Sequence, residues 1–511
     1  MLPEPRVASA VFITAPHSPV ACLTRNQTMS PPDGRSAFFG LMALAMLLPT
    51  LAIPVVVLAM LVQVVLGALN LHAGFGLKRR RTDAPSRFVT PQRLHFSVHL
   101  AIHDEPPAIV ARTLRAFTLQ VDAPEFEVIV LDNNTADPAL WRPIAALCDA
   151  LGPAFRFYHE EGVTGAKAGA LNIALARTNP AATHVVIVDA DYEVTPDFLA
   201  IAAQELQRSG DDFVQFPQAY HGDAGPAQGL SLELADYFLR HARQANLARA
   251  MLLTGTLSVI SRPALEAVGG WSLRSITEDA ELGLRLHRAG YRGRFVDRVV
   301  GRGLLPLDLG GLSLQRYRWA AGNMDTARGV FGGLPARTTL QVFAQLTAWA
   351  NLALPCTATL IGGGAALSLG HHAEASRFLV TLSGIGLVLV YLSVCLPMVI
   401  AMVVRGRPPF KAFGVALAAR GAMILPSALG TVDALMGRSG SFQRTEKDIT
   451  QASDAVGPML PALALCGGAL LTIAHLPAAA ALGAVLMALP YPLALATRRR
   501  LIAYRSALHP A

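Results

Sequence analysis

The sequence has 511 residues, of which 52% are hydrophobic and 15% are charged, with a mean hydropathy of +0.41 and a net charge of +8. Soluble proteins carry about a quarter charged residues, so the composition excludes a simply soluble protein, a disordered chain and a collagen-like chain. The five cysteines have no metal-binding spacing and are too few for a disulfide framework. In so apolar a chain, the basic excess indicates cytoplasmic flanks of membrane segments, and no nucleic-acid partner is expected.

The first apolar run covers 38–71 and contains no charged residue. At about 1.5 Å per residue, a helix of this length is longer than a bilayer core of about 30 Å requires. We therefore expect a transmembrane helix at 37–72, preceded by a disordered N-terminal segment at 1–36. The run is too long, and begins too far from Met1, for a signal peptide.

The segment 73–335 has the charge content of a cytoplasmic α/β domain and follows a basic cluster at 78–81. Short buried strands are expected at 96–102, 126–131 and 184–188. Helices are expected at 107–119, 138–151 and 166–176. Strands that alternate with helices predict parallel βαβ units.

Four more apolar runs follow this domain, at 340–369, 378–404, 459–475 and 476–497. We expect two transmembrane helices at 336–404, a cytoplasmic interfacial helix and loop at 405–456, two more transmembrane helices at 457–498, and a cytoplasmic tail at 499–511. The middle stretch, 413–436, contains Arg420 and Asp433, which suits a helix in the membrane interface better than a span. The basic flanks place all the charged segments on one side of a multi-pass protein.

Acidic residues follow two of the predicted strands. Asp132 ends one strand, and Asp189 and Asp191 directly follow another. Ligands of open α/β sheets bind at this carboxyl edge, and two such carboxylates can hold Mg²⁺ or Mn²⁺. The alternative is an Asx-type turn that caps the strand.

Two helix starts carry further candidates. The segment 162–172 combines small residues with Lys167, so a phosphate could approach the helix N-terminus; an ordinary helix start with an exposed lysine is the alternative. Thr277 precedes Glu278 and Asp279 at a second helix start, where Thr277 suits a cap and Asp279 suits a general base. A capping cluster without catalytic function would explain the same residues.

A last motif, at 315–319, contains Gln315, Arg316, Arg318 and Trp319. Arginine suits diphosphate oxygens, and tryptophan offers a stacking face to a sugar. The alternative is an exposed amphipathic helix that approaches the membrane.

The order and spacing of these features resemble the membrane-embedded inverting glycosyltransferases of family 2. The features are Asp132 at a strand end, the lysine loop at 162–172, the DxD motif at 189–191, the TED motif at 277–279 and the QxxRW motif at 315–319, followed by membrane segments. Cellulose, hyaluronan and bacterial β-glucan synthases are members of this family. The resemblance implies a GT-A fold, which is an α/β nucleotide-diphospho-sugar transferase domain with a mixed central sheet, inserted between transmembrane helices. It also implies a bacterial inner (plasma) membrane location with the catalytic domain in the cytoplasm.

The resemblance assigns roles residue by residue. The catalytic residues would be Asp279 as base and Glu278 beside it. The nucleotide-sugar ligands would be Glu105, Asp132, Lys167, Asp189, Asp191, Gln315 and Arg318, and the metal ligands for Mg²⁺ or Mn²⁺ would be Asp189 and Asp191. The acceptor would contact Trp319, Gly255 and Thr256. The motif of the gating loop would be represented by Phe442, Arg444 and Thr445. Where many members have Tyr-Asn-Glu, this chain has His103-Asp104-Glu105, so only Glu105 is transferred from that motif.

The implied function is transfer of a hexose from a UDP-sugar, with UDP-glucose as first candidate, to a growing β-glycan, in a processive reaction coupled to membrane export. The mechanism would be a single in-line displacement that inverts the anomeric carbon. One alternative is transfer of a single sugar to a membrane lipid. Another is a transporter with a cytoplasmic binding domain, which the scarcity of ionisable residues in the apolar runs disfavours. The implied partners are a nucleotide sugar, a glycan or lipid acceptor, and the bilayer.

Overall fold

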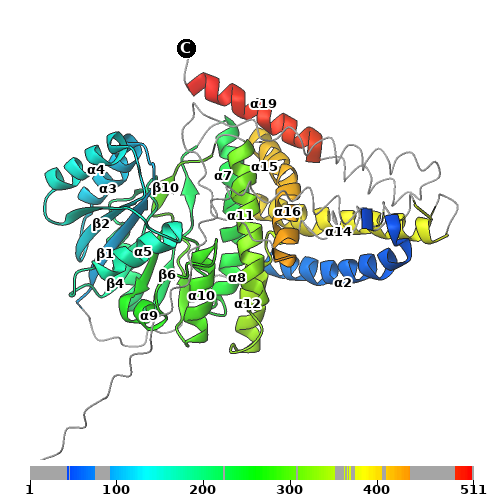
Figure 1. Ribbon diagram of the computed structural model, residues 1–511, viewed down its shortest axis with the longest axis horizontal. Coiled ribbons are helices and arrows are strands. Elements are labelled where there is room, and N and C mark those ends of the chain that lie inside the picture. Colours follow the sequence, from blue (N-terminus) through cyan, green and yellow to red (C-terminus); the bar gives the residue numbers. More distant parts are fainter. Residues whose placement is uncertain are drawn as a thin grey trace, which may run out of the picture.

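In the computed structural model, the described residues are 43–44, 46–74, 93–222, 225–306, 309–350, 362, 365, 368–369, 374–404, 410–437 and 490–508. Figure 1 shows an α/β domain on one side and two long helices that project away from it on the other. The segment 1–36, the gating-type motif at 442–445 and most of the segment 457–498 lie outside the described residues.

The domain is built on a seven-stranded mixed sheet in the order β3-β2-β1-β4-β8-β6-β9. Its strands are β1 (His95–Ile102), β2 (Glu125–Asn133), β3 (Phe155–Glu160), β4 (His184–Ile187), β6 (Phe213–Gln215), β8 (Ser258–Ser261) and β9 (Gly293–Phe295). The first four strands are parallel, and β8 is antiparallel to both of its neighbours. The predicted mixed α/β sheet is therefore confirmed, the three predicted strands β1, β2 and β4 are parallel as expected, and only β8 runs against the other strands of this sheet. A small second sheet has the order β5-β10-β7 and consists of β5 (Glu193–Val194), β7 (Ala219–Tyr220) and β10 (Gly301–Gly303).

Helices cover the sheet. Their bounds are α3 (Pro107–Thr118), α4 (Pro138–Leu151), α5 (Ala166–Ala176), α6 (Phe198–Ser209), α9 (Arg262–Ala267) and α10 (Glu278–Arg288). The sequence pattern predicts α3, α4, α5 and the start of α10 but not α6 or α9. The helices α4 and α5 have the predicted bounds, and α3 ends one residue early. The N-terminus of α4 is fixed by Asp137, which accepts a bond from the N–H of Ala139 at 2.9 Å, and by a proline at the first helical position.

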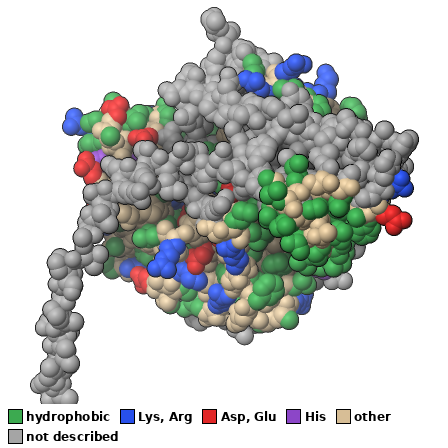
Figure 2. Space-filling view, turned by 45° about the vertical axis from the view of Figure 1, so that its right-hand side comes forward, with side chains coloured by type: hydrophobic (Ala, Val, Ile, Leu, Met, Phe, Trp, Pro, Cys, Tyr) green, Lys and Arg blue, Asp and Glu red, His purple; other side chains and the backbone are tan. Residues whose placement is uncertain are grey.

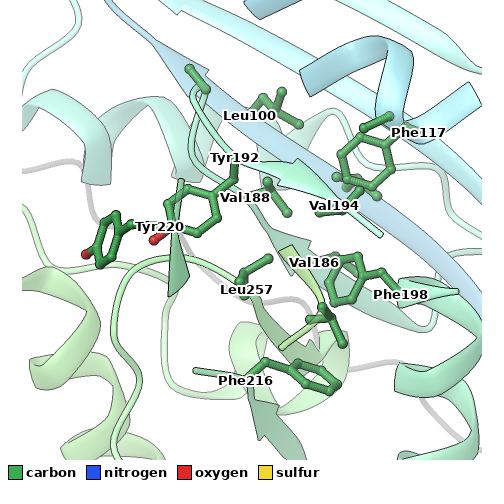
Figure 3. Close-up of a cluster of buried hydrophobic side chains, with 14 of the residues drawn as sticks. Leu100, Phe117, Val186, Val188, Tyr192, Val194, Phe198, Phe216, Tyr220 and Leu257 are labelled. Carbon is green, nitrogen blue, oxygen red and sulfur yellow. The ribbon is translucent and has the colours of Figure 1, made fainter. Parts of the chain in front are cut away.

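The core lies between the sheet and the helices α3 and α6. Phe117 and Phe198 are fully buried against Leu100 and Val186 of the central strands (Figure 3). Because β1 and β4 are covered on both faces, almost all of their residues are buried, including the polar residues Ser97 and His99 of β1. The aromatic pair Tyr192 and Tyr220 ends this cluster, and both rings also border the cavity described below.

A second group of helices lies between the sheet and the projecting helices (Figure 1). It contains α7 (Gly225–Tyr237), the π-helix η2 (Phe238–Ala242), α8 (Arg243–Asn246), α11 (Leu309–Arg328), α12 (Ala336–Leu346), α15 (Phe410–Ala422) and α16 (Ile424–Leu435). The helix α19 (Pro490–Leu508) runs along the top of this group in Figure 1. The helix α15 packs on α7 and α19, and α16 packs on α11. At Gly430 the two backbones are so close that an added Cβ would lie 2.4 Å from the carbonyl oxygen of Tyr317.

The projecting helices are α2 (Pro49–Gly74) and α14 (Glu374–Val404), which pack on each other. Large apolar side chains of α2 and the turn before it are exposed, including Leu47 at 77% and Leu58 at 63%. Figure 2 shows the resulting hydrophobic face on the part of the molecule that these helices form. Asn70 ties α2 to the domain, because its side-chain oxygen accepts a bond from Arg240 at 3.1 Å and lies 3.0 Å from Nε2 of His241.

Two described helical segments are long and apolar enough to cross a membrane. Pro49–Ala73 has a mean hydropathy of 2.6 with 33% of its most apolar window buried, and Phe410–Leu435 has a mean hydropathy of 1.5 with 76% buried. The second segment is divided into α15 and α16 and packs on the domain, with Asp433 accepting a bond from the Tyr317 hydroxyl at 2.6 Å. The segment Phe410–Leu435 therefore buries most of its apolar surface against protein, whereas most of the apolar surface of α2 is exposed.

Two helices add detail to the expected segments. In the run 340–369, residues 340–346 belong to α12, whose Gln345 donates to the carbonyl of Ala250 at 2.7 Å and holds this helix on the domain. The helix α19 continues through the basic cluster as far as Leu508 and buries Leu501 against the core.

Candidate active site

The site lies at the carboxyl ends of the parallel strands. The register sets Ile102 opposite Asp132 and His99 opposite Ile187, so β1, β2 and β4 end at one edge of the sheet. A cavity of about 530 Å³ lies at this edge and is closed on its other side by residues of α10 and α11. The position agrees with the general rule for open α/β sheets.

Charged side chains dominate one end of the cavity. Its carboxylates are Asp189, Asp191, Glu278 and Asp279, and its cationic groups include Lys167 and Arg318. The ammonium of Lys167 forms an ion pair with Asp189 and donates to the carbonyl of Gly255 at 2.7 Å. One oxygen of Asp191 accepts a bond from the N–H of Leu304 at 3.2 Å. The lysine therefore joins the DxD motif to the 254–257 loop.

Burial and crowding control the ionisation of these groups. Burial, together with the neighbouring Glu278 carboxylate, raises the pKa of Asp279 to about 7. Burial also raises the pKa of Glu278, against the opposing effect of Lys167 and Arg318. For Lys167, burial lowers the pKa, but the facing carboxylates outweigh it and hold the pKa above its ordinary value. Asp279 is thus a carboxylate that takes up a proton near neutral pH.

The 254–257 loop is fixed by a buried glutamine at the end of β6. The side-chain amide of Gln215 donates to the carbonyl of Thr256 at 2.8 Å, and its oxygen accepts from the N–H of Thr254 at 3.0 Å. The hydroxyl of Thr256 in turn accepts from the N–H of Asp189 at 3.0 Å. These bonds hold the DxD motif and the loop at a fixed separation.

The opposite end of the cavity is aromatic. Trp319 of α11 is stacked on Trp349 with ring centres 5.4 Å apart, and Trp349 is stacked on Tyr237 of α7 at 6.0 Å. All three rings line the cavity. An apolar ring face next to polar groups suits a sugar ring.

Two residues on the cavity wall have a left-handed backbone although they are not glycine. Asn134 has φ of 59° and Ala166 has φ of 48°. Each such conformation costs about 1–3 kcal/mol and persists where the surrounding structure imposes it, which is common at functional sites. At Asn134 the side chain provides compensation, since it exchanges two hydrogen bonds with the backbone of Val163 at 2.8 and 2.9 Å.

Sequence comparison identifies the domain that contains this cavity. The profile described as "Glycosyl transferase family 2" matches residues 97–269, and the profile described as "Glycosyl transferase family group 2" matches residues 184–404. The chain belongs to glycosyltransferase family 2. Membership of an enzyme family favours catalysis over the alternative of a transporter.

Curated relatives of this family 2 glycosyltransferase include proteins named for polymer and for lipid products. It is 31% identical to a cellulose synthase catalytic subunit of Xanthomonas axonopodis pv. citri, over 46% of this chain and 33% of the relative. It is 28% identical to a beta-monoglucosyldiacylglycerol synthase of Synechocystis, over 51% of this chain and 55% of the relative. The matches therefore span about a third to a half of these relatives.

A solved structure of a mannosyltransferase from Pyrobaculum calidifontis, in complex with GDP-Man and Mn²⁺, is also similar. Its sequence identity to the family 2 chain is 20% and its TM-score is 0.46, over 78% of this chain and all of the other.

Most residues expected at the site of this family 2 glycosyltransferase line the cavity. These are Glu105, Lys167, Asp189, Asp191, Gly255, Glu278, Asp279, Gln315, Arg318 and Trp319. Their roles remain proposals, because position alone does not assign chemistry.

Asp132 and Thr256 do not line the cavity. Asp132 is 1% exposed, and its two oxygens are bonded to the hydroxyl of Thr135 at 2.5 Å and to Nδ1 of His159 at 2.6 Å. Direct contacts of Asp132 with a nucleotide and of Thr256 with an acceptor therefore do not follow from this structure. Thr277 is at the N-cap position of α10, but its side chain makes no capping bond and packs on Gly322 of α11 instead.

The cavity also contains residues that the sequence analysis did not single out for this site. They are Tyr192, Gln218, Tyr220, Tyr237, Asn323, Gln345 and Trp349. Their positions depend on contacts between elements far apart in the chain. Conversely, Arg316, which lies within the QxxRW motif, points away from the cavity and pairs with Glu233.

We predict that Gly255→Ala disrupts the site. The added carbon would lie 3.1 Å from Oδ2 of Asp279 and 3.7 Å from Nζ of Lys167, at a φ of 82°. Gly269→Ala is the matched control, because Gly269 has φ of 80° but nothing within 4 Å of the added carbon. We expect both variants to lose similar thermal stability and only Gly255→Ala to release nucleoside diphosphate from a nucleotide sugar at least about tenfold more slowly. Equal release rates in Gly255→Ala and Gly269→Ala would contradict the predicted contact of the added carbon with Asp279 and Lys167.

Proposed function

We propose that this chain transfers a hexose from a UDP-sugar, with UDP-glucose as first candidate, to a growing β-glycan at a membrane. The observation that carries the proposal is one cavity lined by a buried carboxylate with a pKa near neutral, by cationic groups and by stacked tryptophans. These are the parts that a displacement at an anomeric carbon needs: a base, a site for the leaving group and a surface for the acceptor.

In this proposal Asp279 is the general base. Its carboxylate accepts the proton of the acceptor hydroxyl while that oxygen forms a bond to the anomeric carbon, and the bond from the anomeric carbon to the diphosphate breaks. A base is most effective when its pKa is close to the working pH, which burial and Glu278 provide here. A single displacement of this kind inverts the anomeric centre.

Lys167 and Arg318 are proposed to bind the diphosphate. Both line the cavity, and Lys167 lies in the first turn of α5, whose N-terminus attracts negative charge. Ala166, the first residue of α5, lines the cavity with a small side chain.

Asp189 and Asp191 are the proposed ligands of Mg²⁺ or Mn²⁺. Among the described residues no group of three or more His, Cys, Asp or Glu forms a metal cage. Two carboxylates nevertheless fit, because Mg²⁺ is commonly held by one or two carboxylates together with substrate phosphates. Three carboxylates of the cavity, Asp189, Glu278 and Asp279, already interact with the charges of Lys167 and Arg318, so an anionic donor would need a further cation. When bound, the ion would neutralise charge on the leaving diphosphate.

Trp319 is proposed to stack on the acceptor end of the glycan. The apolar face of α2 supports a location in the membrane, where a polymer could be exported. A lipid acceptor is the second candidate, supported by the beta-monoglucosyldiacylglycerol synthase, the relative with the larger matched share of the two.

The decisive experiment is to incubate membranes that contain the full chain with a panel of radiolabelled nucleotide sugars and to separate the products. We expect a labelled long glycan from UDP-glucose. Labelled lipid would favour the second candidate, and no labelled product from any donor would reject the enzyme activity.

Replacing Asp279 with Asn should reduce sugar transfer by about 10²- to 10⁴-fold, because the amide cannot accept the proton. Binding of the nucleotide sugar, measured by calorimetry, should be retained. Glu281→Gln is the control, since Glu281 lies on the same helix but pairs with Arg285 outside the cavity. Undiminished turnover in Asp279→Asn would exclude it as the base.

The pH dependence should report the same carboxylate. Because the pKa of Asp279 is about 7 and only the ionised form accepts a proton, kcat/KM should fall as the pH is lowered through about 7. Glu278→Gln removes a negative charge that raises this pKa, so the acidic limb should move to lower pH. In the control Glu281→Gln we expect the acidic limb to stay in place. An unchanged acidic limb in Glu278→Gln would contradict the effect of Glu278 on the pKa of Asp279.

A further inference from the structure

A buried ion cluster lies behind the aromatic end of the cavity. Its members come from four helical elements and are Glu233 and Asp236 of α7, Arg240 of η2, Arg316 of α11 and Arg420 of α15. Each is at most 3% exposed, and none lines the cavity. The mechanism proposed above uses none of these residues.

Arg420 joins the two halves of this ion cluster. Glu233 accepts bonds from Arg316 at 2.9 and 3.2 Å, and Asp236 accepts bonds from Arg240 at 2.5 and 2.7 Å. Arg420 donates to both carboxylates, to Glu233 at 2.6 Å and to Asp236 at 3.1 Å, and also to the backbone carbonyl of Glu233 at 3.0 Å. Without Arg420, each carboxylate would keep one arginine but the two pairs would be separate.

The ion cluster carries a surplus of positive charge. Burial by itself would raise the pKa values of both carboxyl groups, but the arginines outweigh it, lowering the pKa of Glu233 and holding that of Asp236 at about 2. Two carboxylates therefore face three guanidinium groups.

Part of this positive charge rests on an aromatic ring. The guanidinium carbon of Arg316 is 3.9 Å from the ring centre of Trp349, and that of Arg420 is 5.9 Å away. Such cation–π contacts are strong where water is excluded.

Trp349 links the ion cluster to the cavity. It is 6% exposed and stacked between Trp319 and Tyr237, with interplanar angles of 29° and 20°. Its position therefore depends on Arg316 on one side, and it supports the ring of Trp319 on the other.

We propose that Arg420 is a positioning residue for the acceptor end of the cavity. By holding Glu233 and Asp236 together, it fixes Arg316, hence Trp349, and through it the ring of Trp319. The helix α15, which follows the projecting helix α14 in the chain, thereby sets the geometry of the surface on which the acceptor stacks. This inference rests on the proposed sugar transfer and adds a route by which the membrane side of the molecule influences acceptor binding.

Arg420→Met in the full chain tests this inference. The variant leaves two carboxylates and two arginines, so the remaining ion cluster is balanced and the chain is expected to fold. Arg294→Met is the matched control, because Arg294 is a buried arginine that also bridges two carboxylates, Glu205 and Asp211, away from the cavity. Arg420→Lys keeps the charge without the bidentate fork and provides a folded variant if Arg420→Met is unstable.

Two measurements separate positioning from stability. The first measurement uses the donor that the labelled panel identifies and a soluble β-glucan pentasaccharide as acceptor probe. Arg420→Met should raise the KM for the acceptor by about tenfold, because a stacking surface is lost, and should leave the KM for the donor unchanged. The near-ultraviolet circular dichroism of the stacked tryptophans should also weaken. Arg420→Lys should restore both in part, and Arg294→Met should change neither.

Equal acceptor KM values and equal tryptophan spectra in Arg420→Met and Arg294→Met would overturn the positioning role. The spectrum does not depend on sugar transfer. A weakened tryptophan signal in Arg420→Met, in a chain that transfers no sugar to any acceptor, would therefore support the positioning contact while rejecting the proposed function.

Discussion

The crowding of negative charge at one edge of the sheet is the constraint on which the site depends. Asp189, Asp191, Glu278 and Asp279 face the same cavity as Lys167. Unscreened carboxylates repel one another, so they stay close only because rigid elements hold them: the end of β4, the start of α10 and the glutamine-anchored loop between them. Burial, together with repulsion from Glu278, leaves Asp279 able to take up a proton near neutral pH. The repulsion that opposes this arrangement thus also contributes to its chemistry.

Local patterns in the sequence were sufficient for the parts of this site that depend on local structure. The DxD pair follows an apolar strand, and Glu278 and Asp279 open a helix, so both could be predicted from neighbouring residues. The surroundings of Asp132 could not, because its partner His159 lies on another strand. The packing of the apolar run that begins inside α12 could not either, since composition does not distinguish a face that packs on protein from one that packs on lipid.

One turn of α11 serves both the cavity and the ion cluster behind it. Gln315, Arg318 and Trp319 share a face because they are three or four residues apart, and they line the cavity. Arg316 lies on the other side of the same turn, where it meets Glu233 and Trp349. In this chain the QxxRW segment therefore contains two arginines with different surroundings, and only Arg318 lines the cavity.

The π-helix η2 has a consequence for how such chains can diverge. It is a single wide turn between α7 and α8, and it lets the adjacent residues Arg240 and His241 both reach Asn70 of the apolar helix α2. A π-turn accommodates one residue more than an α-helical turn, so removing one residue would leave α8 nearly in phase with α7. The same deletion would separate Arg240 and His241 from the partner that they share, so we expect it to loosen α2 from the domain while the rest of the fold is kept.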